Sequence, residues 1–212
     1  MFGLIVGAIG SLVTGAMSVA KVLSGLKLVV DALKIVGNAI ASIAKALGII
    51  KPERDVEELG DRALQAEEMG IKPEDYDSYE AWVRKIEDDN WGYDPEKNKD
   101  MNAEDKILKG VEVSTAVTME KFPNLPIQEF YEIVNSNKEF FTVERMDEIG
   151  KLACTDGDAF ENVINYMTNK TNDSIQVNEA IDILMDIEMK IDPTMNEDRA
   201  YNKVTSYHSF KV

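Results

Sequence analysis

The sequence predicts an all-α protein in which an apolar, glycine- and alanine-rich N-terminal helix or helical hairpin precedes an acidic domain of several helices. Three observations lead to this fold class. Apolar residues recur at helical spacing along most of the chain. Capping residues, glycines and prolines divide it into segments of helical length, and no segment shows sustained two-residue alternation of β-branched residues. We divide the 212 residues into segments 1–51 and 52–193 and a polar tail, 194–212.

The charge of the chain is distributed as unevenly as its hydrophobicity. Residues 1–51 hold five lysines against Asp31 alone, which gives +4, so the formal net charge of −16 leaves −20 for the remaining residues. Such a split indicates two segments that face different surroundings. Nucleic-acid binding depends on lysine and arginine displacing counterions from phosphates, and no basic patch interleaved with aromatic residues follows Lys51. We therefore expect no nucleic-acid partner.

The first 20 residues carry no charged side chain and would form a helix about as long as the hydrocarbon core of a bilayer is thick. Their many small and hydroxyl residues make this a marginal transmembrane helix. Small residues recur at every fourth position in two rows, an arrangement that lets helix backbones approach closely. In water, each glycine there would cost about 1 kcal/mol relative to alanine. The predicted helix-contact residues are Gly3, Gly7, Ser11, Gly15, Ala16 and Ala20.

The segment after Ser24 and Gly25 has the polar spacing of an amphipathic helix that ends near Gly48. Its longest uncharged run, residues 35–44, is too short to span a bilayer, so we expect it to lie in the interface with its lysines toward lipid headgroups. The predicted membrane-surface residues are Lys21, Lys27, Lys34 and Lys45. A hairpin that turns near residues 24–25 and one continuous helix assembled with copies of itself both fit this pattern.

Beyond residue 52, turn and cap signals delimit seven helices. Gly70 closes the first of them, Pro73 lies in the first turn of the second, and Asn102, Thr142 and Ser174 cap the third, fifth and seventh. The predicted helices are 53–69, 73–88, 103–121, 127–135, 143–153, 158–168 and 175–191. Residues 89–101 form the predicted long loop, and we expect the tail from residue 194 onward to be ordered only by a partner.

Residues of types that often carry chemistry have structural explanations here. Trp82 and Trp91 are predicted to anchor the small core of the acidic domain. Cys154 is the single cysteine, which excludes an intrachain disulfide, and we predict that it is a small core residue. The single histidine, His208, lies in the polar tail, so we expect no Cys/His nucleophile pair.

Residues 94–105 place oxygen side chains at positions that superficially match a calcium-binding loop. Lys99 occupies the position where such a loop needs glycine, and Asp105 replaces the long bidentate glutamate. One cysteine and one histidine do not supply a usual closed zinc site. Among 39 acidic residues no carboxylate pair stands out as an acid–base pair. We predict no enzymatic activity, no catalytic residue, no metal site and no cofactor.

In composition the chain resembles membrane-directed components of phage virions and of secretion or injection machines, which pair a glycine-rich apolar helix with an acidic helical domain. We predict a non-enzymatic, membrane-associated protein in which residues 1–51 contact lipid, copies of the chain, or both, while the acidic domain binds other subunits. The alternative is a soluble structural subunit whose N-terminal helix is buried in a large assembly such as a virion. A typical secreted protein is disfavoured, because the sequence starts without a positively charged region.

Overall fold

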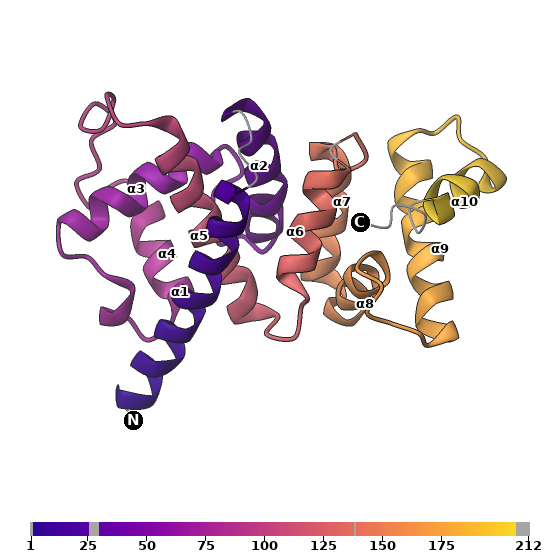
Figure 1. Ribbon diagram of the computed structural model, residues 1–212, viewed down its shortest axis with the longest axis horizontal. Coiled ribbons are helices and arrows are strands. Elements are labelled where there is room, and N and C mark those ends of the chain that lie inside the picture. The colour runs from indigo at the N-terminus through magenta and orange to yellow at the C-terminus, as the bar shows by residue number, and fades with distance from the viewer. Residues whose placement is uncertain (1, 26–29, 138, 207–212) are drawn as a thin grey trace.

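The computed structural model describes residues 2–25, 30–137 and 139–206, and within these ranges the chain is all-helical, as predicted. The helices are α1 Phe2–Gly25, α2 Val30–Ala46, α3 Val56–Glu68, the short 3-10 helix η1 Pro73–Asp75, α4 Tyr79–Glu87, α5 Ala103–Lys121, α6 Ile127–Ser136, α7 Val143–Thr155, α8 Gly157–Met167, α9 Ser174–Ile191 and α10 Glu197–Ser206. They form an elongated molecule with α1 and α3–α5 at one end and α9 and α10 at the other (Figure 1).

Helix α5 is the centre of the N-terminal half and packs against α1, α2, α3 and α4. Its residues 110–118 are buried throughout, so this helix has no solvent-facing side over two turns. The two tryptophans lie in the core beside it. Trp82 donates its indole N–H to the carbonyl of Ile71 at 3.0 Å, and Trp91 donates to the carbonyl of Ile86 at 2.8 Å. Both are buried, which confirms their prediction as core anchors.

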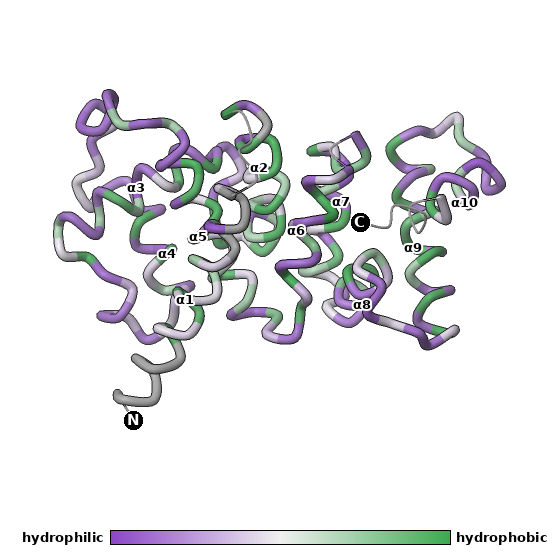
Figure 2. The backbone as a smooth tube through the Cα atoms, in the orientation of Figure 1, coloured by the Kyte–Doolittle hydropathy of each residue, from purple (hydrophilic) through white to green (hydrophobic). Residues whose placement is uncertain are grey.

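Helix α2 connects the two halves of the molecule. It packs against α3, α5, α6 and α7. Its apolar face, which includes Leu33, Val36, Ile40 and Ile43, belongs to the same hydrophobic core as residues of α6–α10. Figure 2 shows the hydrophobic stretch along α2 and the hydrophilic segment between α4 and α5. The boundary predicted near residue 51 therefore separates residues that share one hydrophobic core in the structure. A functional role of residues 1–51 apart from the rest of the chain stays a prediction.

Two N-terminal helices, α1 and α2, are present, but the residues between them, 26–29, lie outside the described part of the chain. The prediction of a hairpin or a continuous helix falls on those residues. Gly48 follows α2 with a φ of +64°, a conformation that favours glycine, and it ends the helix as expected.

Most predicted helix bounds agree with the structure, and α5 agrees at both ends. The first helix after residue 52 begins at Val56 rather than residue 53, because the Asp55 side chain accepts from the Glu58 nitrogen and caps it. Residues 73–88 form two elements instead of one, since Ser78 caps a new helix by accepting from the Ala81 nitrogen.

Two expectations about the C-terminal half are wrong. Residues 197–206 form α10, which packs on α9 within the chain and buries Ala200 and Val204, and the rest of the predicted tail, 207–212, lies outside the described residues. Cys154 is exposed rather than part of the core. It lies at the end of α7, where its thiol donates to the carbonyl of Ala46 at 2.7 Å. It therefore makes a peripheral contact between α7 and α2.

Candidate functional site

The structure divides the predicted helix-contact residues of α1 into two groups. Ala16 and Ala20 are buried, and α1 packs against α5. Gly15 lies on the same side, because a Cβ atom added there would lie 2.8 Å from the Met119 Cε. Ser11 is exposed instead. Gly3 and Gly7 lie in the first turns of α1, and their surroundings fall outside the described residues. The contact made by the described small residues is therefore with α5 of the same chain.

The side of α1 away from α5 carries small and hydroxyl side chains. We call this surface the outer face of α1; its exposed residues are Ser11, Thr14, Met17, Ser18, Lys21 and Ser24. Met17, at 42% exposure, is the large apolar residue among them. Across the described ranges no helix is both long enough and apolar enough to cross a bilayer.

The four predicted membrane-surface lysines lie in different environments. Lys21 is exposed on α1, and Lys27 lies outside the described residues. Lys34 binds two carboxylates, Asp55 at 2.9 Å and Glu57 at 2.8 Å. The hydrogen bond with Glu57 raises the pKa of Lys34. Lys45 is partly buried in a groove. The described lysines therefore do not form one row that faces away from the protein.

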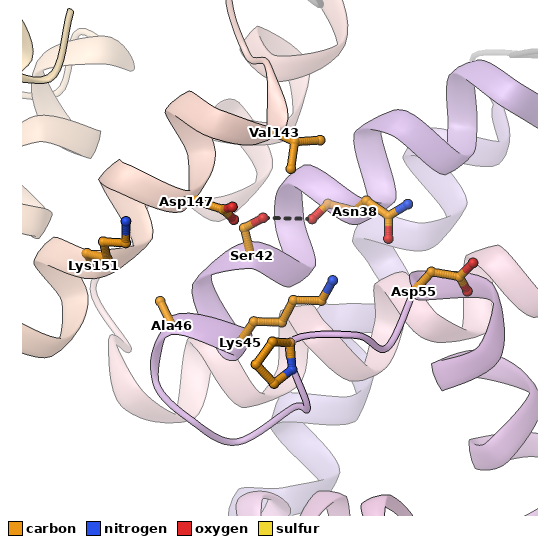
Figure 3. Close-up of a pocket in the computed structure, with 9 residues that line it drawn as sticks. Asn38, Ser42, Lys45, Ala46, Asp55, Val143, Asp147 and Lys151 are labelled. Atoms are coloured by element: carbon orange, nitrogen blue, oxygen red, sulfur yellow. Dashed lines mark hydrogen bonds between the residues drawn. The ribbon is translucent and has the colours of Figure 1, made fainter. Parts of the chain in front are cut away.

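The groove that contains Lys45 has a volume of about 440 Å³ and lies between α2, α7 and the segment that leads to α3 (Figure 3). Its polar lining comes from Asn38 and Ser42 of α2, Asp55, and Asp147 and Lys151 of α7, and its apolar lining from Ala46, Pro52 and Val143. We call it the Lys45 groove. Its volume lies within the range typical of small-molecule sites.

Lys45 is the cation of this groove that has no paired carboxylate among the described residues. Asp55 is paired with Lys34, and Lys151 is paired with Glu148 at 2.5 Å. Burial lowers the pKa of Lys45, and the more distant charge of Asp147 partly offsets this effect. The ammonium has thus lost part of its hydration without gaining an ion pair.

A second hollow, of about 510 Å³, adjoins the first and shares Lys45 and Pro52 with it. Its wall is formed by residues 48–51 on one side and by Arg84 and residues 87–90 on the other. Carboxylates dominate this second wall. Lys45 therefore stands between two hollows, one beside α7 and one beside the end of α4.

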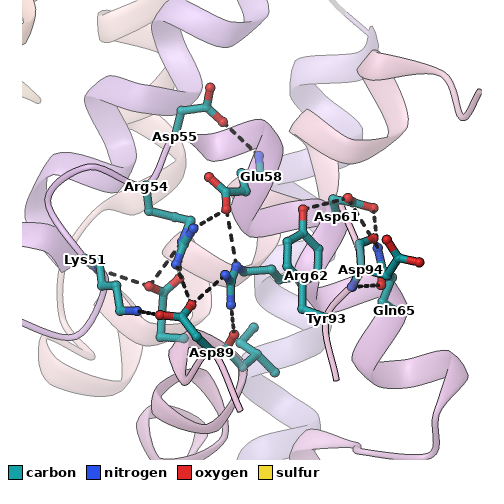
Figure 4. A network of polar contacts seen from close by, with 12 residues as sticks. Lys51, Arg54, Asp55, Glu58, Asp61, Arg62, Gln65, Asp89, Tyr93 and Asp94 are labelled. Carbon is teal, nitrogen blue, oxygen red and sulfur yellow. Dashed lines mark hydrogen bonds and ion pairs between the residues drawn. The ribbon is translucent and has the colours of Figure 1, made fainter. Parts of the chain in front are cut away.

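An ion-pair network around the buried side chains of Arg54, Arg62 and Glu87 holds the segment between α2 and α3 against the end of α4 (Figure 4). Arg54 binds Glu87 at 3.2 Å and also pairs with Glu58. Arg62 donates to the carbonyl of Ile86 at 3.0 Å and to Asp89 at 2.9 Å. A buried charge that loses its partner is strongly destabilising, so each of these side chains holds the others in place. The network therefore fixes one wall of the hollow beside Lys45.

The long loop 89–101 is fastened to α3 by a second polar cluster. Asp61 accepts from the Asn98 amide at 2.7 Å and from the Tyr93 hydroxyl at 3.0 Å, and the Arg62 guanidinium lies 4.3 Å from the centre of the Tyr93 ring. Within the described chain no group of three or more histidine, cysteine or acidic side chains is arranged to hold a metal ion. Tyr93 and Asn98 thus attach this loop to α3.

The chain matches no family model, no curated protein and no solved structure among those compared. Functional inference therefore rests on the two surfaces described above, the outer face of α1 and the Lys45 groove.

Lys45 is predicted from the sequence to lie at a membrane surface, and Ser42 and Asp147 are not predicted as site residues. Position 147 is about 100 residues from α2 in the chain, and no local pattern signals that α7 packs beside it. The one local signal is that Lys45 is flanked by the uncharged, mostly apolar residues 39–44 and 46–47 rather than by other charged residues. Chemically, the groove offers a cation to an incoming anionic group.

Proposed function

We propose that this protein is a non-enzymatic helical subunit that assembles with copies of itself through the outer face of α1. The observation that carries the proposal is the orientation of α1. Its apolar side, with Ile9, Ala16 and Ala20 buried, packs against α5. A bilayer would need that apolar side to leave the core, whereas another helix can pack on the outer face as it stands.

The chemistry of the outer face supports helix packing. Ser11, Thr14 and Ser18 are small, so a second helix backbone can come close. The Thr14 hydroxyl donates to the carbonyl of Gly10 at 2.8 Å, which leaves its oxygen to accept a hydrogen bond across the contact. The segment 1–51 has a charge of +4 in a chain of net charge −16. Acidic surfaces of two copies repel each other, which favours association through the one segment that is not acidic.

Peripheral membrane binding is the second candidate. Exposed Val30 and Ile35 on α2, at 39% and 50%, favour it, because apolar side chains beside lysines are typical of interfacial helices. Lys34, however, is already bound to Asp55 and Glu57. Lys34 is therefore less available to bind lipid headgroups than the sequence alone suggests.

Disulfide cross-linking of the full-length chain tests the proposal. In a Cys154→Ser background, Ser18→Cys places one thiol on the outer face, and Ser174→Cys places a matched control at the exposed first residue of α9. We expect mild oxidation to link Ser18→Cys chains into dimers much faster than Ser174→Cys chains. Ser18→Arg should reduce the mass measured by sedimentation, while Ser174→Arg should not.

Flotation with anionic vesicles separates the two candidates. A protein that sediments as a monomer, fails to cross-link through Ser18→Cys and floats with the vesicles would favour the membrane over assembly. A monomer that neither cross-links nor floats would contradict both.

A further inference from the structure

We infer that the Lys45 groove binds a small amino carboxylate, with Lys45 binding the carboxylate and Asp147 binding the ammonium group. This inference is independent of the proposed assembly, because the groove lies on α2 and α7 rather than on α1. It starts from the charges of the groove that the protein leaves unpaired.

Four ionisable side chains line the groove, and two of them are already paired. Asp55 binds Lys34, and Lys151 binds Glu148. Lys45 and Asp147 have no ion pair with any described residue, and they lie on opposite walls, Lys45 on α2 and Asp147 on α7 (Figure 3). The groove thus presents one positive and one negative group, which is the complement of a zwitterion.

Hydrogen-bonding groups of α2 lie beside Lys45. The Asn38 side-chain oxygen accepts from the Val56 nitrogen at 2.9 Å, so its amide nitrogen is left to donate to a ligand. The Ser42 hydroxyl donates to the carbonyl of Asn38 at 3.2 Å, which leaves its oxygen lone pairs to accept from an ammonium group. The polar wall therefore offers a donor for a carboxylate and an acceptor for an amine.

The remaining wall is apolar. Val143 is 51% exposed at the rim, and Ala46 and Pro52 complete this side. Burial of an aliphatic side chain on these residues would contribute to binding. A volume of about 440 Å³ accommodates an amino acid of the size of leucine.

The charges also argue against other ligand classes. A phosphate would meet Asp55 and Asp147 across the same groove, and like charges at short range oppose binding. A simple amine would meet Lys45 and Lys151. A ligand with one charge of each sign avoids both conflicts.

Calorimetric titration of the full-length protein with four probes tests this inference. The probes are leucine, 4-methylpentanoate, which lacks the amino group, 3-methylbutylamine, which lacks the carboxylate, and inorganic phosphate. We expect saturable binding of leucine below about 10 mM and binding at least about tenfold weaker for each of the others.

Three variants complete the test. Lys45→Met and Asp147→Asn should each weaken leucine binding by about tenfold or more, whereas Lys72→Met, at an exposed lysine before η1, should leave it unchanged. Thermal unfolding of each variant checks that it is folded. The inference is overturned if leucine does not saturate, if phosphate or 4-methylpentanoate binds as well as leucine, or if both groove variants bind as the native protein does.

Discussion

Gly60 of α3 and Gly110 of α5 lie in backbone contact where their helices cross, because a Cβ atom added at Gly60 would lie 2.7 Å from the Gly110 nitrogen. At each of the two glycines, an added Cβ atom would collide with the backbone of the other helix. A Cβ atom added at Gly110 would overlap the Val56 carbonyl of α3, and one added at Gly60 would overlap the Lys106 carbonyl of α5. Backbone atoms cannot rotate away as side chains can, so the two helices would have to separate.

Gly60→Ala and Gly110→Ala should therefore each lower the free energy of unfolding by about 3 kcal/mol or more, at or above the upper end of overpacking effects. Urea denaturation measures this change. Gly10→Ala is the matched control, since an added Cβ there meets nothing within 4 Å. It should stabilise α1 by about 0.5–1 kcal/mol, because alanine is the better helix former. Equal effects at the three glycines would contradict the close crossing.

A buried ion pair joins α7, α9 and α10. Arg145 binds Glu188 at 2.5 Å, and their side chains are 4% and 1% exposed. Lys203 of α10 binds the same carboxylate at 2.5 Å. Glu188→Gln would leave Arg145 buried without a counter-charge, and we expect a loss of about 3–5 kcal/mol in unfolding free energy.

The control for Glu188 is Glu148, which pairs at the surface with Lys151 and Lys190, both more than half exposed. Glu148→Gln should change the free energy of unfolding by about 1 kcal/mol at most, because water screens such pairs. If the two substitutions cost the same, the buried pair does not hold the C-terminal helices together.

Helices that begin with a capping side chain could be predicted from neighbouring residues in the sequence. Asn102 caps α5 and Thr142 caps α7, and in both cases the side chain accepts a backbone N–H of the first turn, from Glu104 and Arg145. The spacing of small residues in α1 singled out Ala16 and Ala20, and both are buried. It did not identify the partner as α5, because that packing depends on residues about 100 positions away.

Helix α10 was missed for a physical reason. Its buried side consists of Ala200 and Val204, two residues one turn apart, which is too little for a hydrophobic period to appear in the sequence. Packing on α9 supplies the stability that local propensity does not. The Lys45 groove was equally inaccessible, since it exists only where α2 and α7 meet.

Val204→Ala tests the packing of α10. Val204 is fully buried and belongs to the core of the C-terminal half. Removing two methyl groups should lower the free energy of unfolding by about 2 kcal/mol, and the amides of residues 200–206 should exchange with solvent faster than before. Thr205→Ala, on the partly exposed side, is the control. Unchanged exchange in Val204→Ala would mean that α10 is not held by this contact.

Lys45 and Lys34 should have opposite effects on stability. Burial lowers the pKa of Lys45, so its protonated form destabilises the folded state, and this cost disappears as the pH rises through the folded pKa toward the unfolded value of 10.5. Lys45→Met should therefore stabilise the protein at pH 7, by no more than about 0.5 kcal/mol because the side chain is only partly buried. This gain should vanish in unfolding experiments above about pH 10.5.

Lys34 differs because its bonds to Glu57 and Asp55 raise its pKa, so its contribution is favourable below 10.5 and is lost only as the pH rises through the higher folded pKa. Lys34→Met should accordingly destabilise the protein at pH 7. A lysine that costs stability at neutral pH is expected where a site is kept ready for a ligand. Saturating leucine should raise the free energy of unfolding of the native protein but not that of Lys45→Met. This result would show that the ammonium group that lowers stability at pH 7 is also the group that binds the ligand.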